Sequence, residues 1–420
     1  MSSVTTLYRL ILLCLFSVCG YLYSQEVAIQ KYTVDLNGQV QLEINSDTDH
    51  YYILEIKHTP GGDFDLITSM TLGEAGTTTI TEPLSQYPLE RYRVLEYPIA
   101  SPIDSDDDGV DDITEFNNIP TQAPLNPAPP IDIKDGTVAV DSLSTFRKLA
   151  VTKERVQWAE YLNGKSFVKY LITDWKTDKP KVFYINTETH RFHKDFGDAI
   201  DVESLGENVR KGEIIYHPTT VSNNGTLGTF TFGFSNGHGD DFEVVQKCHE
   251  LLAINMPLLK NNLSYFVTTN SKDEYDRDET LYEQSRVPVL LEDDVYAEVD
   301  YWALNQAEGF GFFRKMDLEE TPGPRDVVLY ESVPNELPRV GGIMTSAIQS
   351  PLSHVNLRAI QDQTPNAFIR NPLEIDSIAD LLNDFVYYKV DQNQYIIRKA
   401  SLEEVNAWFE ELRPSEEQVP

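Results

Sequence analysis

A short, strongly acidic stretch restricts what this chain can fold into more than any other feature of the sequence. Residues 104–115 contain seven carboxylates, and one of the few neutral residues among them is Gly109. So many like charges cannot be buried together without a cation. The stretch must therefore form a surface loop, which divides the 420-residue chain into a short part before it and a long part after it. A chain of this length has room for roughly two to four domains with full cores.

The spacing of the acidic residues is that of a calcium-binding loop. Side-chain oxygens stand at positions 1, 3, 5, 9 and 12 of the stretch, and position 7 offers a backbone carbonyl. Glycine at position 6 permits the sharp turn. Calcium takes roughly six to eight oxygens, and the terminal glutamate can supply two of them. The predicted ligands are Asp104, Asp106, Asp108, Val110, Asp112 and Glu115. A solvated acidic linker that binds no ion is the alternative.

The flanking residues indicate the kind of loop. The residues ahead of it, 97–102, include two prolines and do not suggest the helix that opens an EF-hand. With Asn126-Pro127 behind it, the loop resembles the thrombospondin type 3 calcium loops of exported proteins. This resemblance implies a structural Ca²⁺ ion that stiffens a joint between domains. Extracellular modules of this sort bind calcium at roughly 10⁻⁴ to 10⁻³ M.

The first 24 residues are typical of a secretory signal peptide. A single positive charge, Arg9, precedes an uncharged apolar run over 10–23 that is short for a membrane span, and Ser24 offers a small residue for cleavage. We therefore expect an exported protein (periplasm, cell surface or extracellular) without a transmembrane segment after cleavage. An uncleaved anchor and lipid attachment at Cys19 are the alternatives. Cleavage leaves Cys248 as the remaining cysteine, with no partner for an intrachain disulfide.

The overall charge limits the partners. A net charge of −33 repels nucleic acid and anionic membranes and attracts divalent cations. We therefore expect calcium as a partner and no nucleic acid.

Hydrophobic periodicity predicts a multidomain chain. Five alternating runs over 26–100 predict an all-β sandwich that resembles a fibronectin type III module. After the calcium loop (104–116), five prolines within 117–135 predict a linker and the clearest domain boundary. Residues 136–322 mix both periodicities and predict an α+β domain, with a helix over 241–259. A third unit is expected at 323–400, followed by a helix and tail at 401–420, where Ser401 and Glu404 have capping-box spacing.

His354 is the residue whose sequence context most favours a catalytic role. Pro351 and Ser353 ahead of a periodic run predict a helix start, which places His354 in the first turn, where free N–H groups favour an anion. Arg358 follows four residues later on the same face. A neutral histidine is a competent nucleophile toward phosphorus. A surface or capping histidine without such a role is the alternative.

The same segment resembles the phosphohistidine, or swivelling, domain of the phosphoenolpyruvate synthase and pyruvate, phosphate dikinase family. The likeness rests on Gly342–Thr345, on Ser353-His354-Val355 and on Pro365-Asn366-Ala367. It implies a β/β/α swivelling fold in which His354 carries a phosphoryl group, Ser353 helps to orient it and Arg358 contacts the phosphate. Two departures are Gln349-Ser350-Pro351, where a Gly-Gly pair commonly precedes Ser-His, and Ile360, where the dikinases have an arginine.

A wider likeness covers residues 136–414. Segments 179–186, 285–288, 307–309 and 335–339 are similar to the region ahead of the ATP-binding domain in an exported subgroup with a PEP/pyruvate-binding domain. The resemblance implies part of a phosphotransferase (kinase). Nothing in the sequence looks like an ATP-grasp domain or a Walker-type phosphate loop. ATP and Mg²⁺ are therefore expected only if an ATP-grasp kinase domain continuing past the C-terminus is supplied.

Two other function classes stay open. The first is a non-catalytic calcium-binding cell-surface or adhesion protein that retains the swivelling fold as a binding module. The second is a metal-dependent hydrolase built on the central histidines, for which structural roles are the simpler interpretation. These histidines are His190, His193, His217, His238 and His249.

Overall fold

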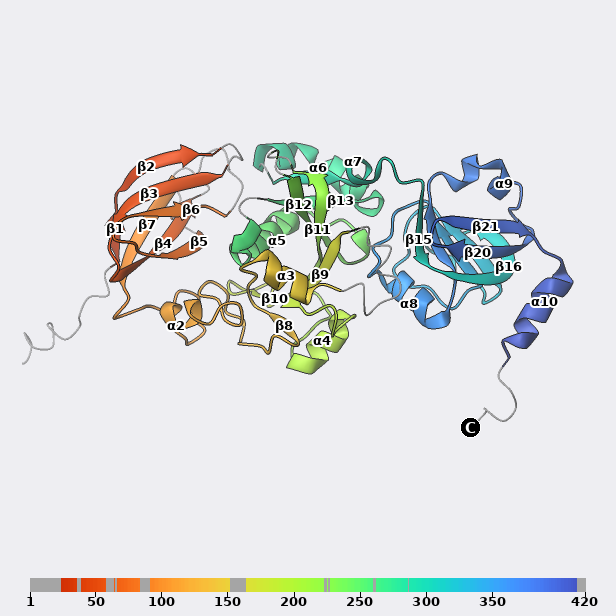
Figure 1. The fold of residues 1–420 in the computed structure, drawn as a ribbon, viewed down its shortest axis with the longest axis horizontal. Helices are drawn as coiled ribbons and strands as arrows, with labels where there is room; N and C mark the ends of the chain where they lie inside the picture. Colours follow the sequence, from red (N-terminus) through yellow and green to blue (C-terminus); the bar gives the residue numbers. More distant parts are fainter. Residues whose placement is uncertain are drawn as a thin grey trace, which may run out of the picture.

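The computed structural model describes residues 24–35, 39–57, 64, 66–83, 91–151, 164–222, 225, 227–259, 262–285 and 287–413. Figure 1 shows sheet-containing units following one another along the long axis, which confirms the prediction of a sheet-rich, multidomain chain. The predicted signal peptide lies outside the described residues, apart from Ser24. None of the helices in the described ranges has both the length and the apolar character needed to cross a membrane.

The N-terminal unit consists of two antiparallel sheets packed face to face. One sheet has the order β1 (Gln25–Val27), β7 (Arg91–Pro98), β4 (His50–Lys57), β5 (Leu66–Leu72), and the other has the order β2 (Ile29–Val34), β3 (Val40–Ser46), β6 (Gly76–Thr81). Alternate residues of β3 point inward, so that Leu42 and Ile44 meet Tyr52 and Val94 of the facing sheet. β5 and β6 are therefore outer strands, each at the end of its sheet.

The proline-rich segment at 117–135 lies between the N-terminal and middle units, but it is packed and is not the free linker that its composition predicts. It follows the helix α2 (Asp112–Phe116), and its Ala128 and Ile131 are buried against Phe183 of the middle sheet. The buried amide of Asn126 donates to the carbonyls of Val138 and Val182, at 2.8 Å each, and accepts from the Val182 N–H at 2.9 Å. Proline has no N–H to satisfy, so a proline-rich segment can pack without strand partners. Composition alone does not separate this arrangement from a free linker.

The middle unit is a mixed sheet with helices around it. Its strand order is β14 (Val289–Leu291), β13 (Leu263–Val267), β12 (Leu227–Phe234), β11 (Arg210–Val221), β9 (Ser166–Thr173), β10 (Lys181–Ile185), β8 (Gly136–Thr137). The helices are α3 (Leu143–Leu149), α4 (His193–Ile200), α5 (Phe242–Ile254), α6 (Lys272–Ser285) and α7 (Glu292–Tyr296), with short 3₁₀ turns η2 (Ser235–Gly237), η3 (Pro257–Leu259) and η4 (Thr269–Ser271). The helix predicted over 241–259 is α5. Its periodic residues Val245, Cys248 and Leu252 are buried as expected, and the cysteine is free. The segment ends early because Pro257 cannot continue the helix.

The third unit begins earlier than predicted. Its sheet has the order β15 (Tyr301–Asn305), β19 (Asn366–Ile369), β18 (Gly342–Thr345), β17 (Asp326–Tyr330), β16 (Ala307–Lys315), β20 (Phe385–Asp391), β21 (Gln394–Lys399). The predicted boundary at 322/323 is wrong because β15 and β16 pair with β19, β17 and β20, partners that lie up to about 80 residues further along the chain. Such pairing leaves no local mark in the sequence.

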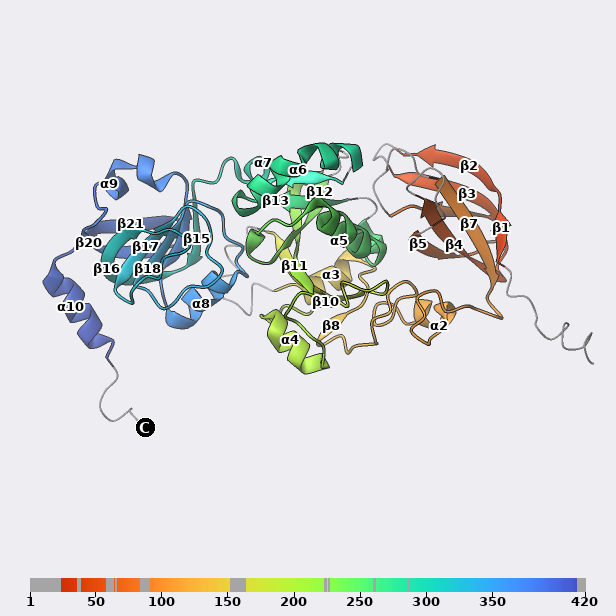
Figure 2. The same ribbon diagram turned by 180° about the vertical axis from the view of Figure 1, so that it is seen from behind.

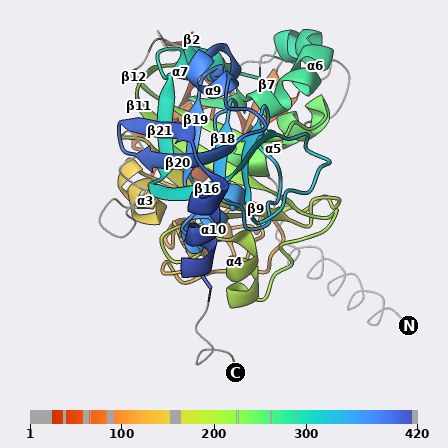
Figure 3. The same ribbon diagram turned by 90° about the vertical axis from the view of Figure 1, so that its right-hand side faces the viewer.

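Helices complete the third unit. α8 (His354–Asp362) connects the parallel strands β18 and β19, and η5 (Pro372–Glu374) and α9 (Asp376–Ala379) are short. α10 (Leu402–Glu411) lies at the outer end of the molecule (Figures 1 and 3). Its capping box between Ser401 and Glu404 is present as predicted.

The middle and third units share one apolar core. Phe266 and Tyr296 of the middle unit belong to the same buried cluster as Trp302, Phe313 and Leu352 of the third. Polar contacts reinforce the junction, since Lys169 Nζ donates to the Leu352 carbonyl at 3.1 Å and the Ser350 hydroxyl bonds to the Glu213 carboxylate. The segment just ahead of His354 is therefore docked on the middle sheet.

Candidate functional site

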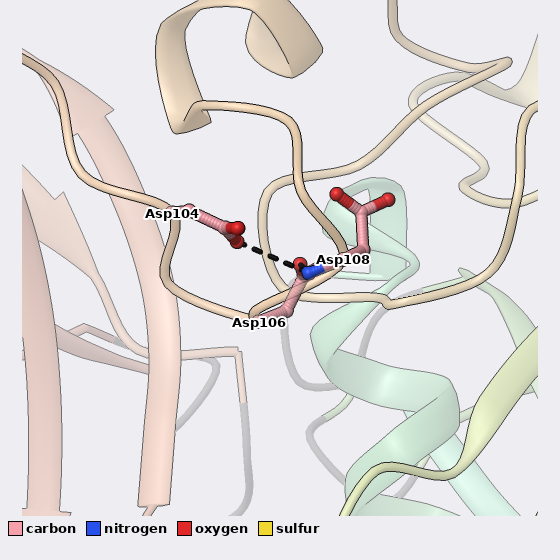
Figure 4. Close-up of side chains that lie close together, drawn as sticks. All are labelled: Asp104, Asp106 and Asp108. Atoms are coloured by element: carbon pink, nitrogen blue, oxygen red, sulfur yellow. Dashed lines mark hydrogen bonds between the residues drawn. The ribbon is translucent and has the colours of Figure 1, made fainter.

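The acidic stretch forms a tight loop between β7 and α2. Asp107 and Gly109 take positive φ angles of 57° and 100°, the conformation that the sharp turn requires. Backbone N–H groups hold the carboxylates in place: the Asp108 N–H donates to Asp104 and Asp106 at 3.2 Å, and the Gly109 N–H donates to Asp104 at 2.9 Å. Figure 4 shows the side chains of Asp104, Asp106 and Asp108 gathered on this turn.

The loop concentrates carboxylate oxygens that lack partners. One oxygen from each of Asp104, Asp106 and Asp108 lies within 4.8 Å of the others, the one group in the described ranges arranged to hold a metal ion. Glu115 is 1% exposed, and among the described residues neither of its oxygens has a hydrogen-bond partner, nor does Oδ2 of Asp106. Buried carboxylates without partners are costly. A cation would remove that cost, so the loop could hold a metal ion.

Burial and mutual repulsion shift the acidity of these groups. Burial, and then the charges of Asp106 and Asp108, raise the pKa of Glu115 from its ordinary value of 4.5 to about 8. Burial, and then the charge of Asp108, raise the pKa of Asp106 from 3.8 to about 7. In both cases burial is the larger cause and the repulsion between neighbouring carboxylates is the smaller one.

Two predicted ligands, Asp112 and Glu115, lie outside the group formed by the three aspartates. Asp112 instead holds the loop in place. Its oxygens accept from the Ser105 N–H and hydroxyl, at 2.8 Å each, and from the Tyr51 hydroxyl at 3.0 Å. The Tyr51 hydroxyl in turn accepts from the Ile103 N–H at 3.0 Å. Position 9 of calcium loops often acts through a water molecule, which agrees with this arrangement. The Val110 carbonyl stays a predicted ligand.

The loop contacts the units on both sides. Tyr51 belongs to β4 of the N-terminal unit, and Lys179 of the middle unit pairs with Asp107 at 2.7 Å. Seen from behind, α2 lies between the N-terminal unit and the strands β8 and β10 (Figure 2). The loop therefore occupies a joint. Sequence reasoning missed Tyr51 as an anchor because its neighbours in the chain give no sign of its contact with Asp112, which is 61 residues further along the sequence.

His354 is the first residue of α8, as the predicted helix start requires. The Ser353 hydroxyl caps the helix by accepting from the Asn356 N–H at 3.1 Å. The imidazole is half-buried beside Phe192, with 5.7 Å between ring centroids, and lines an open depression of about 600 Å³. Burial, and then the charges of Lys169 and Lys211, lower the pKa of His354. The imidazole is therefore neutral at neutral pH.

The other predicted members of the histidine site have different contacts. Arg358 lines the same depression, but its guanidinium pairs with Asp362 at 2.7 Å. The Ser353 hydroxyl serves as the cap of the helix. Lys169 and Lys211 supply the positive charge near His354, and sequence reasoning missed both because they come from strands of the middle unit.

The central histidines have separate partners. Within the described part of the chain these histidines form no group of converging metal ligands. The contacts are His190 with Asp135, His193 with the Tyr170 and Gly212 carbonyls, His217 with Thr231, His238 with Asn335 and His249 with the Leu263 carbonyl.

Comparison of the chain with protein family models, with curated proteins and with solved structures finds no significant match.

Proposed function

We propose that this chain is an exported, calcium-binding surface or adhesion protein without catalytic activity. In this proposal the calcium loop fixes a fibronectin III-like sandwich to the middle unit, and the third unit serves as a binding module. The observation that carries the proposal is Glu115: its two buried oxygens lack partners within the described ranges, and its carboxylate is near enough to the three converging aspartates for their charges to raise its pKa. A structural calcium ion at a domain joint accounts for this arrangement.

The ion would be held by Asp104, Asp106, Asp108 and Glu115, with the Val110 carbonyl as a further oxygen. Calcium supplies the positive charge that these carboxylates otherwise lack. Because Glu115 lies in α2, which leads directly into the packed proline-rich segment, a ligand at this position ties the loop to the path of the following chain. Asp112 and Tyr51 tie the other side to β4.

Calcium titration by calorimetry tests the proposal. We expect saturable binding of one Ca²⁺ per chain that is lost in Glu115→Gln and retained in Asp111→Asn. The control variant removes one negative charge from the same loop. It should leave α2 intact, because Asp111 caps this helix by accepting from the Thr114 N–H at 3.0 Å, and asparagine can accept the same hydrogen bond. Equal calcium binding by both variants, or none by the natural chain at millimolar calcium, would overturn the proposal.

A second candidate function is favoured by the surroundings of His354. A neutral imidazole at the first turn of a nine-residue helix, with Lys169 and Lys211 nearby, is a reasonable phosphoryl carrier. The third unit would then be the swivelling domain of a dikinase-like phosphotransferase, with ATP and Mg²⁺ bound by a separate kinase domain. The shared apolar core weighs against this candidate because the unit would have to leave it in order to swing.

Chemical phosphorylation tests the second candidate without a kinase. Phosphoramidate transfers phosphoryl groups to accessible, nucleophilic histidines. We expect an acid-labile phosphoryl adduct that maps to His354 in the natural chain, is absent from that position in His354→Gln and persists in the control His238→Gln, which removes a partly exposed histidine bonded to Asn335 instead. Labelling that is unchanged by His354→Gln would contradict the carrier role.

A further inference from the structure

A second cavity lies on the opposite side of the middle unit from His354. It has a volume of about 400 Å³ and lies between the two outer strands of the sandwich, the start of the proline-rich segment and the end of α5. Its walls include Ser69 of β5, Thr81 of β6, Phe116 of α2 and Ile254 of α5. It is separate from the calcium loop and from the depression at His354, which have other lining residues.

Three polar side-chain atoms in the wall of this cavity have no partner. Within the described ranges, Gln39 Nε2, Thr68 Oγ1 and Ser69 Oγ are all buried and make no hydrogen bond. Gln39 is 5% exposed and Thr68 is 1% exposed. Buried polar groups are nearly always bonded to protein, water or a ligand. The three unpartnered atoms belong to two adjacent positions of β5 and to one loop position. Their lack of partners indicates that this wall of the cavity suits a polar ligand.

The chemistry of the lining restricts that occupant. None of the lining residues in the described part of the chain carries an ionisable side chain, although the chain has a net charge of −33. An ion entering this cavity would lose its hydration without meeting a counter-charge. The polar side chains are hydroxyls and amides, which both donate and accept hydrogen bonds. Additional hydroxyls come from Thr71, Thr79 and Thr81, and an additional amide from Asn255.

The remaining wall is apolar. Met70, Phe116, Ile119 and Leu125 line it. A ligand that fits this cavity therefore has hydroxyls on one edge and a C–H face on the other. A cavity of this volume lies within the roughly 300–1,000 Å³ typical of small-molecule sites.

We propose that this cavity binds a neutral saccharide of one or two rings. The ring hydroxyls bond to Gln39, Thr68 and Ser69, and the C–H face of the ring packs on Phe116 and the neighbouring aliphatic side chains. The four successive residues 68–71 line the cavity, which therefore runs along the free edge of β5, and an extended peptide paired with that edge is the competing occupant. A paired strand would satisfy backbone groups but would leave the three side-chain atoms without partners, so the saccharide accounts for more of the observations.

Ligand-observed NMR and calorimetry on the full chain in saturating calcium test this proposal. The probes are glucose, galactose, mannose, maltose and cellobiose as neutral saccharides, glucuronate and glucosamine as charged ones, and a peptide with the sequence of β5. We expect saturable binding of at least one neutral saccharide and at least tenfold weaker binding of its charged counterpart. Binding of the peptide without any saccharide, or no saturable binding by any probe, would overturn the proposal.

Substitution of Thr68 by valine locates the site. Thr68→Val preserves the shape of the side chain and removes one unpartnered hydroxyl, so it should weaken saccharide binding about tenfold while leaving the unliganded thermal midpoint unchanged or higher. The matched control is Thr77→Val on the exposed part of β6, away from the cavity, which should leave binding unchanged. Undiminished binding by Thr68→Val, or a lower unliganded midpoint for this variant, would show that the hydroxyl has a structural partner and would refute the assignment.

Discussion

The substitution Glu115→Gln should make the chain less stable than the natural chain when calcium is present, and more stable than the natural chain when calcium is absent. In 10 mM calcium, a site with a dissociation constant of roughly 10⁻⁴ to 10⁻³ M stabilises the natural chain by about 1.4–2.7 kcal/mol. For a cooperative unit of roughly 150–250 residues this corresponds to a rise of about 3–11 °C in the thermal midpoint. Glu115→Gln lacks the ligand that contributes two oxygens, so it should gain little from calcium.

Without calcium, the natural chain should be the less stable of the two proteins. The pKa of Glu115 is about 8 in the folded chain against an ordinary value of 4.5, so between these pH values the unfolded chain has lost a proton that the folded chain retains. Stability of the calcium-free natural chain should therefore fall as pH rises from about 4.5 to about 8. A glutamine carries no proton to lose, so at pH 7.5 in chelator Glu115→Gln should be more stable than the natural chain, by up to about 4 kcal/mol, or about 1.4 kcal/mol for each pH unit above 4.5.

Differential scanning calorimetry of the natural chain, Glu115→Gln and Asp111→Asn in chelator and in 10 mM calcium (about 10–100 times the expected dissociation constant) measures both effects. Asp111→Asn should follow the natural chain under both conditions. The reasoning would be refuted if Glu115→Gln gained as much from calcium as the natural chain. It would also be refuted if Glu115→Gln were the less stable protein in chelator, because Glu115 would then have a partner that its geometry does not provide.

Three further predictions concern the joint and the core. Tyr51→Phe removes the hydroxyl between Asp112 and the Ile103 N–H, so urea denaturation should show a loss of about 1–2 kcal/mol, and calorimetry weaker calcium binding; unchanged affinity would contradict the anchoring role. Asn126→Ala removes three buried hydrogen bonds and should cost about 3 kcal/mol in urea denaturation, whereas a loss below about 1 kcal/mol would indicate a loosely held segment. Burial lowers the pKa of His249 from 6.5 to about 4, so in saturating calcium stability should fall as pH drops below about 6.5, by up to about 1.4 kcal/mol per pH unit for this histidine; an unchanged slope in His249→Gln would contradict this.

Local patterns in the sequence predicted the elements whose causes are local. Alternation in β3, the three- and four-residue spacing of Val245, Cys248 and Leu252, and the serine cap ahead of His354 all depend on neighbours a few residues away. The acidic spacing likewise predicted the aspartates that converge, because a tight loop is determined by its own residues.

Features that depend on distant partners could not be predicted in this way. The hydroxyl of Tyr51 contacts a loop that forms much later in the chain, and Asn126 looks like part of a linker until Val138 and Val182 are beside it. Position 9 of the loop was expected to bind the ion directly because the sequence does not show that Ser105 and Tyr51 already occupy Asp112. The wall of Gln39 and Thr68 comes together only when both sheets are packed.

The packed segment after the calcium loop has a mechanical consequence. A free linker would let the sandwich pivot, and a pull on it would straighten the chain before reaching the middle unit. Here a pull meets the loop, held by Tyr51 and Lys179, and then Asn126, whose three hydrogen bonds belong to one side chain and must break at once. The joint should therefore yield in a single abrupt step, and calcium should set the force at which it does so. Single-molecule stretching in calcium and in chelator would show whether the joint resists extension up to one calcium-dependent rupture force or extends freely like a flexible linker.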